Sequence, residues 1–315
     1  MTTRLLFTQL SQSDTAIQIK RLVKAIEQHD IPAFKIKTAR SGCEQIESTR
    51  LTRYFDHIQQ MINLFDDRIV YRYSEHLQAF MDACQDVGLE RRPAGPVCLN
   101  EEGTAYLDYH RSMNVLVARI RQLTSEKWYR RMKDDRRYQA RQQEREITDY
   151  ADAVVGRYAR TIIVRVDLYY RSDAQARLRV EHVFDDLDQL MVKRESNSIF
   201  DHETGYICSV EQGQDRGYHI HAAFFFNGNE VRGDIHKAQL IGELWERITR
   251  GYGCFNSCNH DKDRYEGRLG IGMIRRDDLR ARQHVHEAMR YLVKDEQPLL
   301  VKPLRAKCLR KGQVC

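Results

Sequence analysis

The stretch CSVEQGQDRGYHIHAAFFFNG, residues 208–228, decides the fold of the C-terminal part of this chain. Two runs of residues that favour β-strands flank a short turn segment, which Gly213 and Gly217 delimit. This pattern is typical of a β-hairpin. If Gly213 faces Gly217 across the turn, then Glu211 faces His219 on the neighbouring strand.

The hairpin would bring together three side chains of the types that bind metal ions. Side chains alternate between the two faces of a strand, so His219 and His221 share a face, and Glu211 can point to that face from the partner strand. The apolar continuation AAFFF buries the strand, where a pair of histidines without a role would be costly. Two imidazoles and a carboxylate can bind a divalent ion and leave positions for substrate and water. We therefore predict a metal site formed by Glu211, His219 and His221.

The segments around the hairpin predict further strands and helices. TIIVRVDLYY, residues 161–170, alternates apolar residues with Arg165, Asp167 and Tyr169, which is typical of a strand with one buried face. The other expected elements are helices at 180–193, 234–250 and 277–295 and a strand at 269–274. Strands joined by short turns and interleaved with helices favour an α+β fold, in which an antiparallel sheet carries helices on one side.

We expect the chain to have three parts. Apolar residues recur at steps of three and four through the first half, which predicts a mostly α-helical N-terminal domain at 1–150 whose role the residues do not indicate. The α+β domain follows at 151–300. The last part, 301–315, is a basic C-terminal tail.

The balance of charge is compatible with a nucleic-acid partner. The 315 residues carry a formal net charge of +6. Eight lysines and arginines lie between residues 127 and 145, and each basic cluster is either a solvated surface or a strip that binds phosphates. No run of 18 apolar residues is present, so we expect no membrane segment. Eight scattered cysteines are typical of reduced thiols, and we expect a cytoplasmic protein.

A tyrosine and a lysine in the predicted helix at 277–295 suit phosphoryl chemistry. Tyr291 and Lys294 are three residues apart and therefore neighbours on one helix face. A phenol needs nearby positive charge to act as a nucleophile, and the lysine and the metal ion could supply it; a packed tyrosine beside a solvated lysine is the alternative. His284 and His286 also form an HxH pair, but residues two apart on a helix diverge, so we do not expect them to bind metal.

Together these residues resemble the HUH endonucleases, a superfamily of replication initiators and relaxases. The family motif of two histidines around a hydrophobic residue is matched by HIH at 219–221. The initiators add a carboxylate on the neighbouring strand, which Glu211 matches, and a later helix with YxxK, which Tyr291 and Lys294 match. The resemblance covers about residues 155–300, and this part is similar to the replication proteins of filamentous phages and their prophage relatives in bacteria.

The resemblance implies a five-stranded antiparallel sheet flanked by helices and a rolling-circle replication initiator with a single catalytic tyrosine. Tyr291 would form a 5′-phosphotyrosine, and Lys294 would orient the phosphate. Glu211, His219 and His221 would hold Mg²⁺ or Mn²⁺, although imidazoles by themselves favour softer ions such as Zn²⁺, Mn²⁺ or Fe²⁺. The partners would be single-stranded DNA at a replication origin and the helicase and polymerase of a bacterial host, because the chain has no P-loop motif for a helicase of its own.

Three other hypotheses fit part of the pattern. An iron oxygenase also uses two histidines and one carboxylate, but it leaves the YxxK unexplained. A non-catalytic DNA-binding protein could retain a decayed HUH site. Separately, Cys254, Cys258 and His260 have the composition of a structural zinc site, although no second CxxxC pair is present.

Overall fold

The protein has two compact units. The structure is a computed structural model that describes residues 10–39, 42–65, 69–293 and 299–313. One unit comprises residues 1–135 and 300–304, and the other comprises residues 136–299 and 305–315. None of the helices in the described part of the chain is both long and apolar enough to cross a membrane.

The first unit is mostly helical, with two small pairs of strands. Its helices are α1 (Gln12–Gln28), η1 (Thr52–Tyr54), α2 (Ile58–Asn63), α3 (Glu75–Asp86), α4 (Tyr109–Ser125) and the first part of α5 (Lys127–Arg157). The hairpin of β1 (Phe34–Thr38) and β2 (Glu44–Ser48) was not predicted. A second unpredicted pair joins β3 (Tyr71–Tyr73) to β9 (Val301–Pro303), so part of the expected basic tail forms a strand of this unit.

The second unit contains an antiparallel sheet of six strands. They are β4 (Arg160–Tyr170), β5 (Glu203–Gly213), β6 (Gly217–Asn227), β7 (Gly253–Ser257), β8 (Gly272–Arg275) and β10 (Leu309–Lys311). The order is β10-β5-β6-β4-β7, and β8 pairs with β4 beyond the end of β7. The α+β class and the antiparallel sheet are confirmed, whereas the expected number of five strands was wrong, because the tail supplies an edge strand next to β5.

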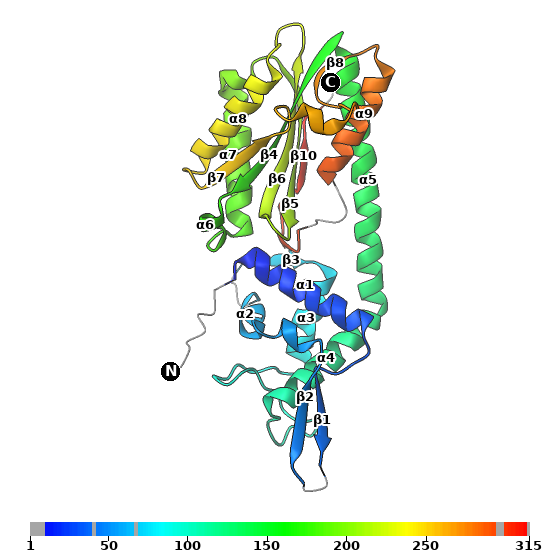
Figure 1. Ribbon diagram of the computed structural model, residues 1–315, viewed down its shortest axis with the longest axis vertical. Helices are drawn as coiled ribbons and strands as arrows, with labels where there is room; N and C mark the ends of the chain where they lie inside the picture. Colours follow the sequence, from blue (N-terminus) through cyan, green and yellow to red (C-terminus); the bar gives the residue numbers. More distant parts are fainter. Residues whose placement is uncertain (1–9, 40–41, 66–68, 294–298, 314–315) are drawn as a thin grey trace. The chain divides into compact units, whose positions relative to one another are not determined.

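Helices cover both faces of this sheet, so the expectation of helices on one side was wrong (Figure 1). The helices of this unit are α6 (Ser172–Gln175), α7 (Val180–Ser196), η2 (Ser198–Phe200), α8 (Asp234–Ile248), η3 (Lys262–Tyr265), α9 (Leu279–Arg290), η4 (Tyr291–Val293) and the rest of α5. On one face, Trp245 of α8 packs against Tyr170 of β4 with ring centroids 5.4 Å apart. On the other face, α5 and α9 enclose a core that includes Ile163 and Phe225.

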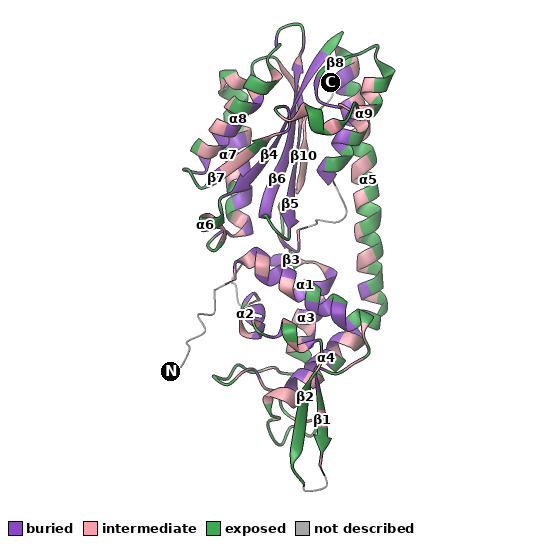
Figure 2. Cartoon of the chain, viewed as in Figure 1, coloured by how far each residue is buried: buried purple, intermediate pink, exposed green. Residues whose placement is uncertain are grey.

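The face covered by α5 and α9 changes from apolar to polar along the strands. At one end, Ile163 pairs with Phe225 in the ladder between β4 and β6, and both belong to the core. Four residues further along β4, Asp167 pairs with His221 on the same face. Figure 2 shows that β4, β5 and β6 are buried along nearly their whole length. The candidate site therefore lies where this core gives way to buried polar side chains.

Candidate metal centre

The hairpin of β5 and β6 sets the positions of the three predicted metal ligands. Gly213 pairs with Gly217 at the turn, and Glu211 pairs directly with His219, so the predicted register is confirmed. Gly217 has a φ of 57°, in the left-handed region where a side chain would be strained. His221 lies two residues beyond His219 and therefore on the same face of β6.

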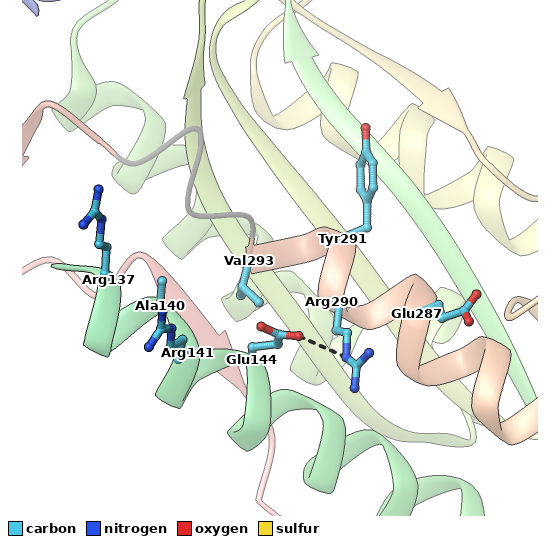
Figure 3. Close-up of a pocket in the computed structure, with 8 residues that line it drawn as sticks. All are labelled: Arg137, Ala140, Arg141, Glu144, Glu287, Arg290, Tyr291 and Val293. Atoms are coloured by element: carbon cyan, nitrogen blue, oxygen red, sulfur yellow. Dashed lines mark ion pairs between the residues drawn. The ribbon is translucent and has the colours of Figure 1, made fainter. Parts of the chain in front are cut away.

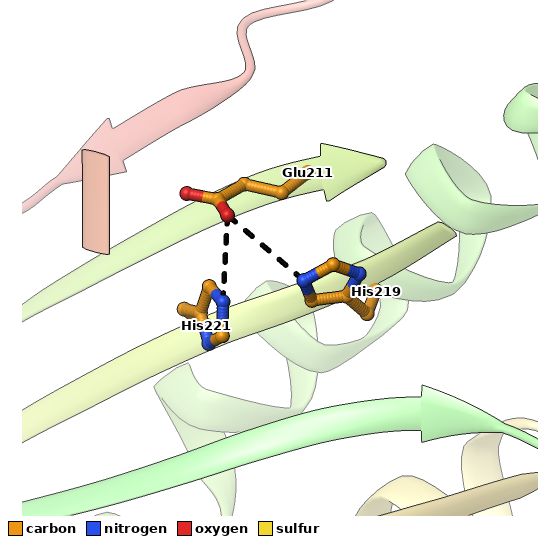
Figure 4. A group of neighbouring side chains, drawn as sticks. All are labelled: Glu211, His219 and His221. Carbon is orange, nitrogen blue, oxygen red and sulfur yellow. Dashed lines mark ion pairs between the residues drawn. The ribbon is translucent and has the colours of Figure 1, made fainter. Parts of the chain in front are cut away.

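The three side chains converge on one buried point, as Figure 4 shows. The Nε2 atom of His221 lies 3.4 Å from Oε2 of Glu211, and Nε2 of His219 lies 3.9 Å from the same oxygen. One ligand atom from each residue lies within 4.8 Å of the others. Among the residues that the structure describes, this is the one group of three or more such side chains close enough to hold a metal ion.

The hydrogen bonds of the two imidazoles orient both rings in the way that metal binding requires. Nδ1 of His219 lies 3.1 Å from the carbonyl oxygen of Gly217, and Nδ1 of His221 lies 2.6 Å from Oδ1 of Asp167. A carbonyl and an ionised carboxylate can only accept, so each Nδ1–H donates and each Nε2 faces Glu211. Metal-binding histidines are held in this way, with the second nitrogen bonded to a carbonyl or a carboxylate.

The buried charges decide how protons compete with a metal ion. Burial lowers the pKa of His219 to about 4, with a further contribution from the charge of His221. Burial also lowers the pKa of His221, but hydrogen bonds to Asp167 and Glu211 outweigh it and raise the pKa to about 8. Burial alone would raise the pKa of Asp167; the hydrogen bond and charge of His221 and the charge of Arg165 reverse this and lower it to about 2. Without metal, His221 thus holds a proton at neutral pH that a metal ion has to displace.

Strand β4 supplies residues to the site that were not predicted from the sequence. The strand was predicted to be half-buried, and this was wrong: Arg165 and Asp167 are only 4% and 7% exposed. They lie on the ligand face, where Tyr169 also donates a hydrogen bond from its hydroxyl to Oδ2 of Asp167 over 3.2 Å. Nη2 of Arg165 lies 3.7 Å from Oδ1 of Asp167. Three polar residues alternating along an otherwise apolar strand were the signal that could have identified them.

Tyr291 lies beside the ligand group. It begins η4, directly after α9, and its ring centroid is 5.6 Å from that of His221, with the two planes at 75°. The guanidinium of Arg165 lies 4.4 Å from the centre of the tyrosine ring, which is the geometry of a cation–π contact. The side chain is 42% exposed, so a ligand can reach it. Lys294, the predicted partner of Tyr291, lies outside the described residues.

A pocket of about 430 Å³ joins the tyrosine to the histidines. Besides Tyr291 and His221, its lining includes Arg165, Arg216 and Arg264. Arg216 comes from the turn of the hairpin, and its guanidinium donates a hydrogen bond to the hydroxyl of a tyrosine on β4. Three arginines in a pocket with a candidate metal site suit a ligand that carries phosphate groups. None of them was predicted as a site residue.

The other candidate ligands do not form a second group within the described ranges. Cys254 lies on β7, and Cys258 follows that strand, with its sulfur 3.7 Å from Oδ2 of Asp167. Burial raises the pKa of Cys258 to about 11, which disfavours the thiolate that zinc requires. In α9, Nε2 of His286, from the second HxH pair, lies 3.2 Å from a carboxylate oxygen of Asp152.

Comparison with known proteins finds similarity over the middle of the chain. No curated protein and no solved structure matches it. Residues 124–259 match the family described as the YagK/YfjJ C-terminal domain, which is less than half of the chain. The matched segment extends from the end of α4 to just after β7 and contains Asp167 and all three candidate ligands, whereas Tyr291 lies beyond it.

Proposed function

We propose that this protein is a metal-dependent nuclease that cuts and rejoins single-stranded DNA through Tyr291. One observation carries the proposal: the ring of Tyr291 lies next to both His221 of the candidate metal group, with ring centroids 5.6 Å apart, and the buried guanidinium of Arg165, which is 4.4 Å from the ring centroid. A phenol, a fixed cation and a metal group in one pocket are the parts that phosphoryl transfer by a tyrosine needs.

Each residue of the pocket would have its own role in the reaction. Bound Mg²⁺ or Mn²⁺ would supply Lewis-acid polarisation of the phosphate. The phenolic oxygen of Tyr291 attacks phosphorus, the bond from phosphorus to the 3′ oxygen breaks, the phenol releases its proton and the 3′ oxygen takes one up. Arg165 and Arg216 offset the charge of the phosphate, and Asp167 holds His221 in the orientation that aims Nε2 at the metal position.

The products are a 5′-phosphotyrosine and a free 3′-hydroxyl. The phosphotyrosine conserves the bond energy, so that a new 3′-hydroxyl can reverse the step and close a circle without ATP. This chemistry suits the start of rolling-circle replication, with single-stranded DNA at an origin as substrate and a host helicase and polymerase as partners. Support for this role comes from the HIH, Glu and YxxK motifs together with the contact of Tyr291 with the ligand group.

A covalent-capture experiment tests the proposal. The purified protein is incubated with Mn²⁺ or Mg²⁺ and with labelled single-stranded DNA from the genetic element that encodes it. We expect label to co-migrate with the protein on a denaturing gel, and both EDTA and Tyr291→Phe to remove it. Tyr252→Phe is the matched control, because Tyr252 is a 60% exposed tyrosine that does not line the pocket, and it should leave the band intact.

The absence of a covalent band from a protein that binds Mn²⁺ would overturn the proposal. Retention of iron through Glu211, His219 and His221 would then favour an oxygenase. DNA binding that is unaffected by Tyr291→Phe and by EDTA would favour a non-catalytic DNA-binding protein.

A further inference from the structure

Tyr291 lines a second pocket as well as the one that His219 and His221 line. This second pocket has a volume of about 500 Å³ and lies between α5 and α9. Figure 3 shows Arg137 and Arg141 on α5 and Arg290 on α9, with Tyr291 following at the start of η4. A ligand that extends from the first pocket past the tyrosine would therefore enter a space bordered by these three arginines and by Glu144 and Glu287.

The charge of this part of α5 is strongly positive. Residues 136–145 contain four arginines and a single acidic residue, Glu144. The carboxylate of Glu144 is already paired, since Nε of Arg290 lies 3.1 Å from its Oε1. Arg137 and Arg141 are four residues apart, so their Cβ atoms lie about 5–6 Å from each other on one helix face. Both are exposed, and their guanidinium groups match the geometry of phosphate oxygens.

An exposed aromatic side chain accompanies these arginines. Tyr138 is 65% exposed and lies three residues before Arg141, so the two are neighbours on the surface of α5. Surfaces that bind single-stranded nucleic acids combine cations along the backbone with aromatic rings on which the bases stack. A duplex keeps its bases stacked on one another and gains little from such a ring.

We propose that the pocket between α5 and α9 binds the strand of single-stranded DNA that continues from the phosphate at Tyr291. Arg137 and Arg141 contact consecutive phosphates, and Tyr138 stacks on a base. The inference rests on the proposed function, because the reacting phosphate fixes where the strand enters. It adds the path of the strand, which the candidate catalytic residues do not define.

Equilibrium binding tests this path without any chemistry. All variants are made in the full chain with Tyr291→Phe and are measured in EDTA by fluorescence anisotropy of a labelled single-stranded oligonucleotide over a series of salt concentrations. Each phosphate contact contributes about 0.7 to the slope of log affinity against log salt for a single strand. The double variant Arg137→Gln, Arg141→Gln should therefore have a slope that is smaller by about 1.4. As salt falls from 1 M to 0.1 M, its affinity should then rise by about 25-fold less than that of the parent protein.

Three further variants separate phosphate contacts from general loss of charge. Lys193→Gln with Arg247→Gln removes the same charge from exposed positions on α7 and α8, which cover the other face of the sheet, and should leave the slope unchanged. Arg137→Lys with Arg141→Lys should keep most of the slope. Tyr138→Ala should weaken single-strand binding about tenfold or more with little change of slope, and should not weaken duplex binding.

The outcomes distinguish this inference from the nuclease proposal. An unchanged slope for Arg137→Gln with Arg141→Gln, an equal loss for the control pair, or tighter binding of duplex than of single strand would overturn the path, even if the covalent band forms. A reduced slope confined to the α5 variant supports the path even if no covalent band appears, in which case only the proposed chemistry fails.

Discussion

Replacing Asp167 with asparagine would test whether the candidate metal group is built as the structure indicates. Asp167 accepts a hydrogen bond from Nδ1 of His221 over 2.6 Å and faces the guanidinium of Arg165 at 3.7 Å. Asparagine has nearly the same shape, and its carbonyl oxygen can still accept from Nδ1–H. The substitution therefore keeps the orientation of the imidazole and removes mainly the negative charge behind it.

The expected effect on metal affinity depends on pH in a defined way. Loss of an outer carboxylate partner costs about 10- to 100-fold in affinity, or about 1.4–2.7 kcal/mol. At pH 7 this loss is partly hidden: the pKa of His221 is about 8, so a proton competes with the metal and weakens wild-type binding by about tenfold. Removing the charge of Asp167 lowers that pKa and relieves the competition. At about pH 9 the proton no longer competes, and the full 10- to 100-fold loss should appear.

The same substitution should destabilise the metal-free protein. The pKa of Asp167 is lowered from 3.8 to about 2, so its ionised form contributes about 2 kcal/mol to the free energy of unfolding. A lowered pKa stabilises the fold above pH 3.8, and this contribution is lost as the pH falls through about 2. At neutral pH, Asp167→Asn should thus reduce the free energy of unfolding by about 2 kcal/mol. It also leaves the charge of Arg165 buried without its partner.

Two measurements on Asp167→Asn and on a matched control variant test these expectations. Mn²⁺ affinity is measured by calorimetry at pH 7 and 9, and the free energy of unfolding by urea titration in EDTA. Asp186→Asn is the matched control, because Asp186 accepts a hydrogen bond from the hydroxyl of Tyr170 over 2.9 Å on the opposite face of the sheet. It should leave Mn²⁺ affinity unchanged. If Asp167→Asn binds Mn²⁺ at pH 9 as tightly as the wild type does, Asp167 does not support a metal ligand and the assignment of the group fails.

Three further predictions address the ligands, the competing proton and the packing of the second unit. His219→Ala should reduce Mn²⁺ affinity by more than the ~100-fold that an outer partner contributes, whereas His284→Ala should leave it unchanged in the same titration. Mn²⁺ affinity should rise about tenfold per pH unit up to about pH 8, where His221 loses its proton, and level off above; a flat profile would contradict the raised pKa. Gly242→Ala would place a methyl group against a phenylalanine ring of β7 and should destabilise the protein by about 1–3 kcal/mol. Gly156→Ala in α5, where the added methyl group would meet only the guanidinium of Arg282 at 4.0 Å, should stabilise it by up to about 1 kcal/mol in the same urea titrations.

The elements that could be predicted from sequence are those determined by nearby residues. The hairpin register follows from the glycines at 213 and 217, and once it is known, the convergence of Glu211, His219 and His221 follows from the alternation of side chains. The helices α7 and α8 begin at or within a residue of their predicted starts, because their apolar periodicity is a local property.

The elements that were missed depend on contacts between distant parts of the chain. Leu309–Lys311 carries no strong strand pattern of its own. It becomes a strand because it pairs with β5 along the edge opposite β6. The short strand Gly253–Ser257 forms in the same way, against β4. The number of strands in the sheet was therefore not accessible from local patterns.

The polar face of β4, which was predicted to contact water, also explains why the site lies where it does. Arg165 and Asp167 would destabilise a buried strand if they served only to hold the sheet together, since apolar side chains would pack there at lower cost. They persist because each has a partner within the pocket: Asp167 bonds to His221, and Arg165 faces both Asp167 and the ring of Tyr291. A strand that alternates charged residues with apolar ones inside a sheet covered on both faces thus indicates a buried polar site, whereas the same alternation in a sheet covered on one face indicates only contact with water.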